Sequence, residues 1–318
     1  MNRDRGILIL KAVAIIGVVF HHIHNRRLDS EAREWLSFLP PLFSWCVLMF
    51  LAISGWLHAM SDDKGVKPAR EVITSRAMRL LLPFGALVFC YAVAWQILQT
   101  SGAVPLGGDV PSGFAAKIFF SLWPVHETVA DQLYFLPMLF AISLVAHAIL
   151  RLGGPGALGV LACSLFAAGI AFFPKSPNTG FLPGVFVWGL FSYAGGYLLF
   201  RFKSRRETLI LLACCSAVIV LVVGVAGIAK VFPLIVLASM RVLRLASLPL
   251  LPVLGEASGT VYLYHQPFLL QTMLIGVAKL PTWQLQAFAA LGAATLAMAI
   301  CCAMYFALKR TRLRVILM

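Results

Sequence analysis

Long apolar segments separated by short charged ones run through this chain and restrict what it can fold into. A helix needs about 20 mostly apolar residues to cross a bilayer, and the sequence offers about ten such segments. We expect membrane spans at 7–23, 40–60, 74–98, 131–151, 156–173, 183–200, 207–229, 230–247, 257–278 and 283–308. The sequence therefore predicts an all-α, polytopic integral membrane protein. We expect a single domain over residues 1–318 with no appended soluble domain.

The composition excludes a soluble enzyme. Charged residues make up 12% of the chain and hydrophobic residues 61%, whereas a soluble domain has roughly 25% charged residues. The net charge of +14 would suggest a nucleic-acid partner for a soluble protein. Here the charges fall between apolar spans, so the expected partner is the lipid bilayer and no nucleic acid is expected.

The distribution of positive charge predicts the orientation, because lysine and arginine are in excess in cytoplasmic loops. With the N-terminus inside, eighteen of the 26 Lys and Arg residues fall on the cytoplasmic side and seven on the outer side. Lys11, inside the first span, is the remaining one. An even number of spans places the C-terminus inside as well. We expect a multi-pass protein of the cytoplasmic (inner) membrane.

Titratable residues within apolar spans are costly and are therefore candidates for function. In the first span, Lys11 and His22 are eleven positions apart, which places them about 16 Å apart and on nearly the same helix face. Snorkelling of Lys11 to the headgroups explains the lysine equally well. His21 and His24 lie nearby, but acidic and cysteine partners for a metal are not evident, and we expect no metal site.

Two arginines open the third span. The i, i+3 spacing of Arg76 and Arg79 puts both guanidinium groups on one face of a regular helix. Such a pair can bind a phosphate in a bidentate manner, and it would face the cytoplasm, where phosphorylated cofactors occur. An ordinary positive anchor at the membrane surface is the alternative.

Polar side chains also enter two other apolar segments. Ser54 lies in the second predicted span, where close helix packing is the simplest explanation. Glu256, Tyr262 and His265 enter or line the ninth span. Structural and functional roles are equally open for these residues.

Taken together and in order, these segments resemble the acyltransferase type 3 family of ten-helix membrane acyltransferases. The resemblance rests on six elements: Lys11 with His22; Phe50, Ser54, Gly55 and Trp56; Arg76 with Arg79; Tyr134, Phe135 and Leu136; Gly195 to Arg201; and Gly255, Ser258, Tyr262 and His265. The chain departs from the family pattern in having Lys11 where arginine is usual and Tyr134 where tryptophan is common.

The resemblance implies transfer of an acetyl or other short acyl group from cytoplasmic acyl-CoA to a hydroxyl group of an extracytoplasmic polysaccharide or glycolipid. Acetyl-CoA would be a donor substrate, and no permanently bound cofactor is expected. Arg76 and Arg79 would bind acyl-CoA. His22 would act as general base or as acyl-accepting nucleophile, with Lys11 beside the same path. Ser54, Tyr134, Glu256, Tyr262 and His265 are possible lining residues of the active site.

Two other functions fit the same residues. In a transporter or flippase, the intramembrane histidine, lysine and arginine side chains would form a path for substrate or protons. A non-catalytic membrane scaffold would keep the fold without the activity. The sequence predicts no particular oligomeric state.

Overall fold

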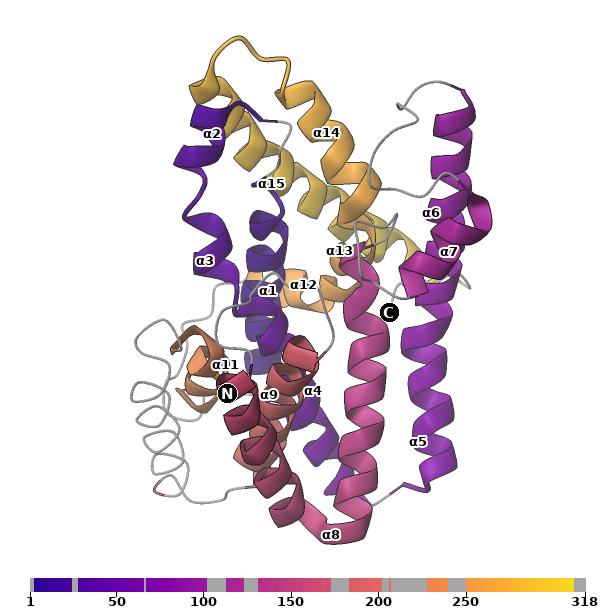
Figure 1. Ribbon diagram of the computed structural model, residues 1–318, viewed down its shortest axis with the longest axis vertical. Helices are drawn as coiled ribbons and strands as arrows, with labels where there is room; N and C mark the ends of the chain where they lie inside the picture. Colours follow the sequence, from indigo (N-terminus) through magenta and orange to yellow (C-terminus); the bar gives the residue numbers. More distant parts are fainter. Residues whose placement is uncertain are drawn as a thin grey trace. The chain divides into compact units, whose positions relative to one another are not determined.

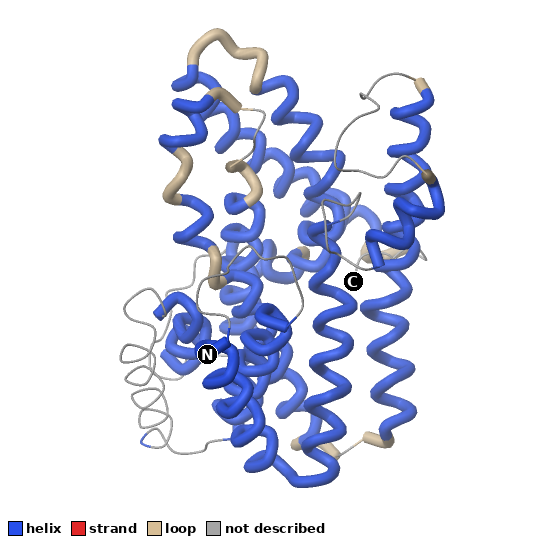
Figure 2. Tube along the Cα trace, in the orientation of Figure 1, coloured by secondary structure: helices blue, strands red, loops and turns tan. Residues whose placement is uncertain are grey.

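The computed structural model describes residues 3–24, 28–65, 67–101, 113–122, 131–172, 183–201, 206, 228–239 and 250–311. Within these ranges every regular element is a helix, and none is a strand (Figure 2). The all-α prediction is therefore confirmed for the described part of the chain. Nearly all of the predicted span at 207–229, up to residue 227, and the end of the span at 230–247 lie outside the described residues.

Four described helical stretches are long and apolar enough to cross a membrane: Ser30–Asp62, Ala69–Thr100, Phe135–Ser164 and Trp283–Leu308. Several carry large apolar side chains on their surfaces. Phe288 and Leu296 on the last stretch are 65% and 54% exposed, which would be unfavourable in water and suits contact with lipid. These stretches fit an integral membrane protein. The count of ten spans and the orientation stay predictions.

The described chain divides into two compact units, Met1–His58 with Gly195–Met318, and Ala59–Ala194. The first unit is built around helix α1 (Arg3–His21). It packs against α3 (Leu39–Phe43), α12 (Leu250–Glu256), α13 (Ser258–Tyr264) and α15 (Trp283–Leu308). Ala12, Ala14, Ile15 and Val19 of α1 are fully buried, as expected for a helix that is apolar on all sides.

Within the first unit, the part of α4 (Cys46–Asp62) up to His58 meets the part of α9 (Pro183–Arg201) from Gly195 onward. A Cβ atom added at Gly196 would come 1.9 Å from the carbonyl oxygen of Ala52. Trp56 packs edge-on against Phe200, and the ring of the buried His58 packs edge-on against a second aromatic ring of α9. The small residue therefore allows the two backbones to approach, and the aromatic rings fill the space beside them. Helix α11 (Ile228–Ser239) completes this part.

Hydrogen bonds of Gln286 with Asp29 and Leu280, here called the clip, connect two parts of the first unit beyond the end of α1. The side-chain oxygen of Gln286 in α15 accepts a hydrogen bond from the backbone N–H of Asp29, at 3.0 Å. Its amide nitrogen donates to Asp29 Oδ2 at 2.8 Å and to the carbonyl of Leu280 at 3.0 Å. Gln286 is 1% exposed. The clip joins the start of α2 (Ser30–Trp35) to the turn between α14 (Leu270–Val277) and α15.

The second unit contains two long helical rods that run side by side (Figure 1). The first is α5 (Ala69–Arg76), which continues through a π-helical turn, η1 (Ala77–Leu81), into α6 (Leu82–Thr100). The second is α8 (Phe135–Phe172), preceded by a 3₁₀ turn, η2 (Asp131–Tyr134). Helix α7 (Phe114–Leu122) packs against α6.

The rod α8 is broken at Gly154, whose φ of 71° is left-handed. Glycine adopts this conformation without a steric penalty, and a proline follows it directly. The break lies between the two spans that the sequence predicts at 131–151 and 156–173. The predicted boundary thus coincides with the break, whereas two separate membrane spans at this place stay a prediction.

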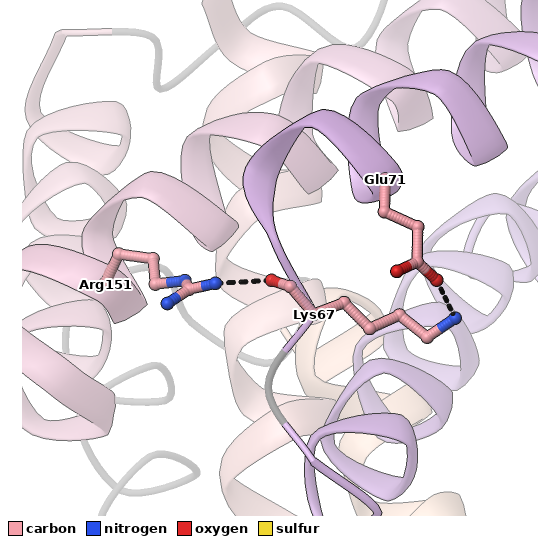
Figure 3. Close-up of polar contacts among 3 residues, drawn as sticks. All are labelled: Lys67, Glu71 and Arg151. Carbon is pink, nitrogen blue, oxygen red and sulfur yellow. Dashed lines mark hydrogen bonds and ion pairs between the residues drawn. The ribbon is translucent and has the colours of Figure 1, made fainter.

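Arg151, near the break in α8, also holds the loop that leads into α5. Its guanidinium group donates a hydrogen bond to the backbone carbonyl of Lys67 (Figure 3). The ammonium group of Lys67 pairs with Glu71, four residues further along. Lys67 is therefore bound to two helices: its backbone carbonyl to α8 and its side chain to α5.

Candidate active site

Two histidines from distant parts of the sequence meet in the first unit. His22 directly follows the last residue of α1, and His265 directly follows α13. Their ring centroids are 5.4 Å apart, and the ring planes are inclined at 47°. His22 is partly exposed and His265 is fully buried. The pair therefore joins a partly exposed imidazole to a fully buried one.

The helix irregularity at His265 has a local cause. The chain leaves helical geometry at Gln266, whose φ of −129° and ψ of 163° are extended. Residue 267 is a proline, and the residue before a proline is disfavoured from the helical conformation. A π-helical turn, η4 (His265–Leu269), spans this point. Such turns are frequent at functional sites.

The hydrogen bonds of His265 determine which of its nitrogens carries the proton. Nδ1 lies 2.9 Å from the carbonyl oxygen of Val261 and 3.1 Å from that of Tyr262. A carbonyl oxygen only accepts, so Nδ1 donates, and in the neutral ring the lone pair is then on Nε2. Nε2 is buried and has no hydrogen-bond partner among the described residues. Buried polar atoms are seldom left in this state.

Two other aromatic side chains border the pair. The ring of Tyr262 is 6.5 Å from that of His265, and His21 packs edge-on against His22 at 5.6 Å. Of the residues that the sequence singles out, the structure therefore brings His22, Tyr262 and His265 together. It also places His21, the neighbour of His22, at the same site.

Lys11 and Ser54 lie elsewhere in the first unit. Lys11 is on α1, partly buried, and regular helix geometry puts it about 16 Å along the axis from position 22. The hydroxyl of Ser54 donates to the carbonyl oxygen of Phe50, one turn earlier, at 2.7 Å. This bond within its own helix is common for serine in apolar helices and gives Ser54 a local structural role.

Glu256 makes its contacts with α15. Its carboxylate accepts hydrogen bonds from the hydroxyl of Tyr305 at 3.1 Å and from the ammonium group of Lys309 at 3.2 Å. Helix α12 ends at Glu256, and α13 begins two residues later. Helix α13 separates Glu256 from His265 along the chain, and the carboxylate binds instead at the C-terminal end of α15.

Arg76, Arg79 and Tyr134 belong to the second unit. Arg76 is the last residue of α5, whereas Arg79 is inside the π-helical turn η1. Arg76 is partly buried and Arg79 is exposed. The prediction that both project from one face assumed a regular α-helix, and that assumption is wrong here because the wider turn changes the angle between them. Tyr134, partly exposed, ends η2.

A metal centre would need several ligand side chains close together. Among the described residues, no group of three or more His, Cys, Asp or Glu side chains could hold a metal ion.

The residues that sequence reasoning missed are Asp29 and Gln286. Their reciprocal hydrogen bonds hold the segment that follows His22. A signal existed, because Gln286 is a polar residue within a long apolar span. Its partner could not be found, because no periodicity links positions so far apart in the chain.

Comparison with known proteins gives one match. The model of the acyltransferase type 3 family, described as an acyltransferase domain, matches residues 4–307, which is nearly the whole chain. The matched range includes both histidines and both arginines. No curated protein and no solved structure matches the sequence.

Proposed function

We propose that this chain, which belongs to the acyltransferase type 3 family, transfers an acetyl or other short acyl group from acyl-CoA to a hydroxyl group of a polysaccharide or glycolipid. Family membership makes it a membrane acyltransferase. The observation that carries the finer proposal is the partly exposed His22 in ring contact with the buried His265. An accessible imidazole is the group that most often removes a proton from a hydroxyl.

The proposed topology has ten spans in the inner membrane, both termini in the cytoplasm and the His22 end of α1 at the outer surface. The four apolar helical stretches support the membrane location. The excess of positive charge on one side of the predicted spans supports the orientation. The donor would then enter from the cytoplasm and the acceptor from outside.

Arg76 and Arg79 are the proposed binding groups for the phosphates of acyl-CoA. Guanidinium groups suit phosphate because they offer several N–H donors in a planar fork. Arg79 is exposed inside the π-helical turn, and Arg76 is the last residue of the helix before it. That arrangement suits a donor with several phosphate groups better than a single bidentate contact.

In the proposed reaction, an unprotonated ring nitrogen of His22 takes the proton of the acceptor hydroxyl. The hydroxyl oxygen bonds to the thioester carbon, the carbon–sulfur bond breaks, and the CoA sulfur receives the proton from His22. Lys11 lies about 16 Å from His22 along α1, too far to contact the same carbonyl. We assign it to orienting the extended arm of the donor.

A covalent route through His22 is the alternative mechanism. The imidazole nitrogen would attack the thioester, hold the acyl group and pass it to the acceptor. Single-turnover incubation with radiolabelled acetyl-CoA and no acceptor separates the two routes. A label retained on His22 means the covalent route, whereas label recovered only as acetyl-CoA means general-base catalysis.

The main test is acetyl-CoA binding and thiol release by detergent-purified protein. We expect saturable binding, and release of free CoA thiol when an acceptor glycan is added. His22→Ala should keep binding and lose thiol release, while Arg76→Ala with Arg79→Ala should weaken binding by about tenfold or more. The control, Lys64→Ala with Arg70→Ala, removes the same charge from exposed positions of the same region. A folded wild-type protein without acetyl-CoA binding would favour a transporter.

A further inference from the structure

We propose that His265 is a positioning residue for His22: its Nε2 accepts a hydrogen bond from a ring N–H of His22. This bond would hold the other ring nitrogen of His22 unprotonated and directed at the acceptor hydroxyl. The inference rests on the proposed role of His22 as general base and names the group that keeps His22 in its active form.

The first step of the argument is the fixed tautomer of His265. Its Nδ1–H is shared between the carbonyl oxygens of Val261 and Tyr262, both in the preceding helical turn. The ring can turn over only by giving up both bonds. Nε2 is therefore held as an acceptor at the side of the ring opposite to the backbone of α13.

The second step is burial. His265 is 0% exposed, and its Nε2 is without a hydrogen-bond partner among the described residues. Most buried polar atoms have a hydrogen-bond partner. Here one nitrogen is satisfied by backbone, and the other makes no hydrogen bond in this structure, although the ring of His22 is in contact with that of His265. The proposed bond would form by rotation of the His22 ring against this nitrogen. At a buried nitrogen, such a bond is stronger than at the surface.

The third step is what general-base catalysis requires of His22. A neutral imidazole has its proton on either nitrogen, and only one tautomer presents a lone pair to the substrate. An acceptor fixed behind the ring selects that tautomer. In serine hydrolases a carboxylate does this for the catalytic histidine. The neutral His265 would do so without placing a negative charge in an apolar environment.

The proton balance of the reaction is unchanged by this role. The proton of the hydroxyl goes to the free nitrogen of His22, and from there to the CoA sulfur as the carbon–sulfur bond breaks. The N–H of His22 that faces His265 keeps its proton throughout. His265 therefore donates and accepts no proton during turnover, and its contribution is to orientation.

Two substitutions at position 265 separate positioning from packing. The amide oxygen of Gln in His265→Gln reaches about as far as Nε2 and can accept from His22. The shorter side chain of His265→Asn offers no acceptor there. We expect His265→Asn to lower kcat by roughly 10- to 100-fold, less than the full contribution of a general base. The KM for acetyl-CoA should stay within about twofold, because His265 acts only through His22.

His265→Gln should recover most of the lost kcat. The matched control is His58→Asn, which removes another buried histidine of the same unit and should leave kcat within about twofold. Thermal unfolding in detergent checks that each variant is folded. Unchanged kcat in His265→Asn, or equal losses in His265→Asn and His265→Gln, would overturn the proposal.

A second readout does not depend on turnover. In ¹⁵N spectra of histidine-labelled protein, assigned with His22→Asn and His265→Asn, we expect a protonated Nδ1 for His265 and one tautomer for His22. In His265→Asn, the His22 signals should become those of mixed tautomers. Unchanged His22 signals would overturn the inference. Failure of the wild-type protein to release CoA thiol would instead overturn the proposed function, while the spectra still test the hydrogen bond.

Discussion

Gly255 of α12 lies against the backbone of Leu8 in α1, so close that a Cβ atom at position 255 would come 1.9 Å from the Leu8 carbonyl oxygen. Unlike the end of a flexible side chain, a backbone carbonyl within a helix cannot move aside alone. The two helices therefore approach at a distance that only glycine permits at this position. His22 directly follows α1, and α12 leads into α13 and His265, so this contact also bears on the histidine pair.

Substitution of this glycine should disturb both stability and activity. We expect Gly255→Ala to lower the free energy of unfolding by roughly 1–3 kcal/mol, the usual cost of an overpacked core. Thiol release should fall as well, because α12 must move away from α1. Unfolding in detergent and the rate of CoA release measure the two effects.

Gly276→Ala is the matched control for that prediction. Gly276 is exposed in α14, and nothing lies within 4 Å of a Cβ atom added there. Alanine is favoured over glycine in a helix by up to about 1 kcal/mol, so this variant should be as stable as the wild type or slightly more so. Equal stabilities of the two variants would contradict the steric argument.

The clip at Gln286 should be equally sensitive. In Gln286→Leu, the side chain keeps its approximate volume, but the N–H and carboxylate of Asp29 lose their buried partners. Asp29 is exposed, so water replaces part of the loss, and removal of the hydrogen bonds should cost about 0.5–1.5 kcal/mol. Gln284→Leu, at an exposed position of the same helix, should change stability by at most about 0.5 kcal/mol. A Gln286→Leu protein as stable as Gln284→Leu would show that the clip contributes nothing.

Glu256 should prove to be structural. Its carboxylate is 43% exposed and pairs with Lys309, which is 31% exposed, and exposed ion pairs contribute about 0–1 kcal/mol. We expect Glu256→Gln to keep the wild-type kcat and to lose at most that amount of stability. Lys309→Met should have a similar effect. The variant with both substitutions should lose less stability than the sum of the two single losses. A tenfold fall in kcat for Glu256→Gln alone would instead place the carboxylate in the active site.

The contact between Arg151 and the backbone of Lys67 predicts local protection of the loop before α5 (Figure 3). Arg151→Gln should increase the rate of tryptic cleavage after Lys64 several-fold, because cleavage requires local opening of the backbone. Glu71→Gln removes only a half-exposed side-chain pair and should leave that rate nearly unchanged. Similar rates in Arg151→Gln and wild type would show that the arginine does not restrain the loop.

Much of the fold follows from local sequence. The last helix, 283–308, agrees with the predicted span, and the boundary between the spans at 131–151 and 156–173 agrees with the break at Gly154. These features are local, because an apolar segment of sufficient length must satisfy its backbone within itself and forms a helix. The assumption that Arg76 and Arg79 lie in a regular α-helix was wrong, because no simple pattern of residue types predicts a π-helical turn.

The candidate site, too, was predicted from the sequence in part and decided by the tertiary structure in part. From the sequence alone came the helical membrane character, the acyltransferase resemblance and a set of polar residues that included His22, Glu256 and His265. Only the tertiary structure decided that His22 and His265 are in ring contact, whereas Glu256 is bound to Tyr305 and Lys309. The physical reason is that hydrophobic burial is non-directional and sets which segments become helices. Which side chains then meet depends on how closely those helices pack, and on where each is interrupted.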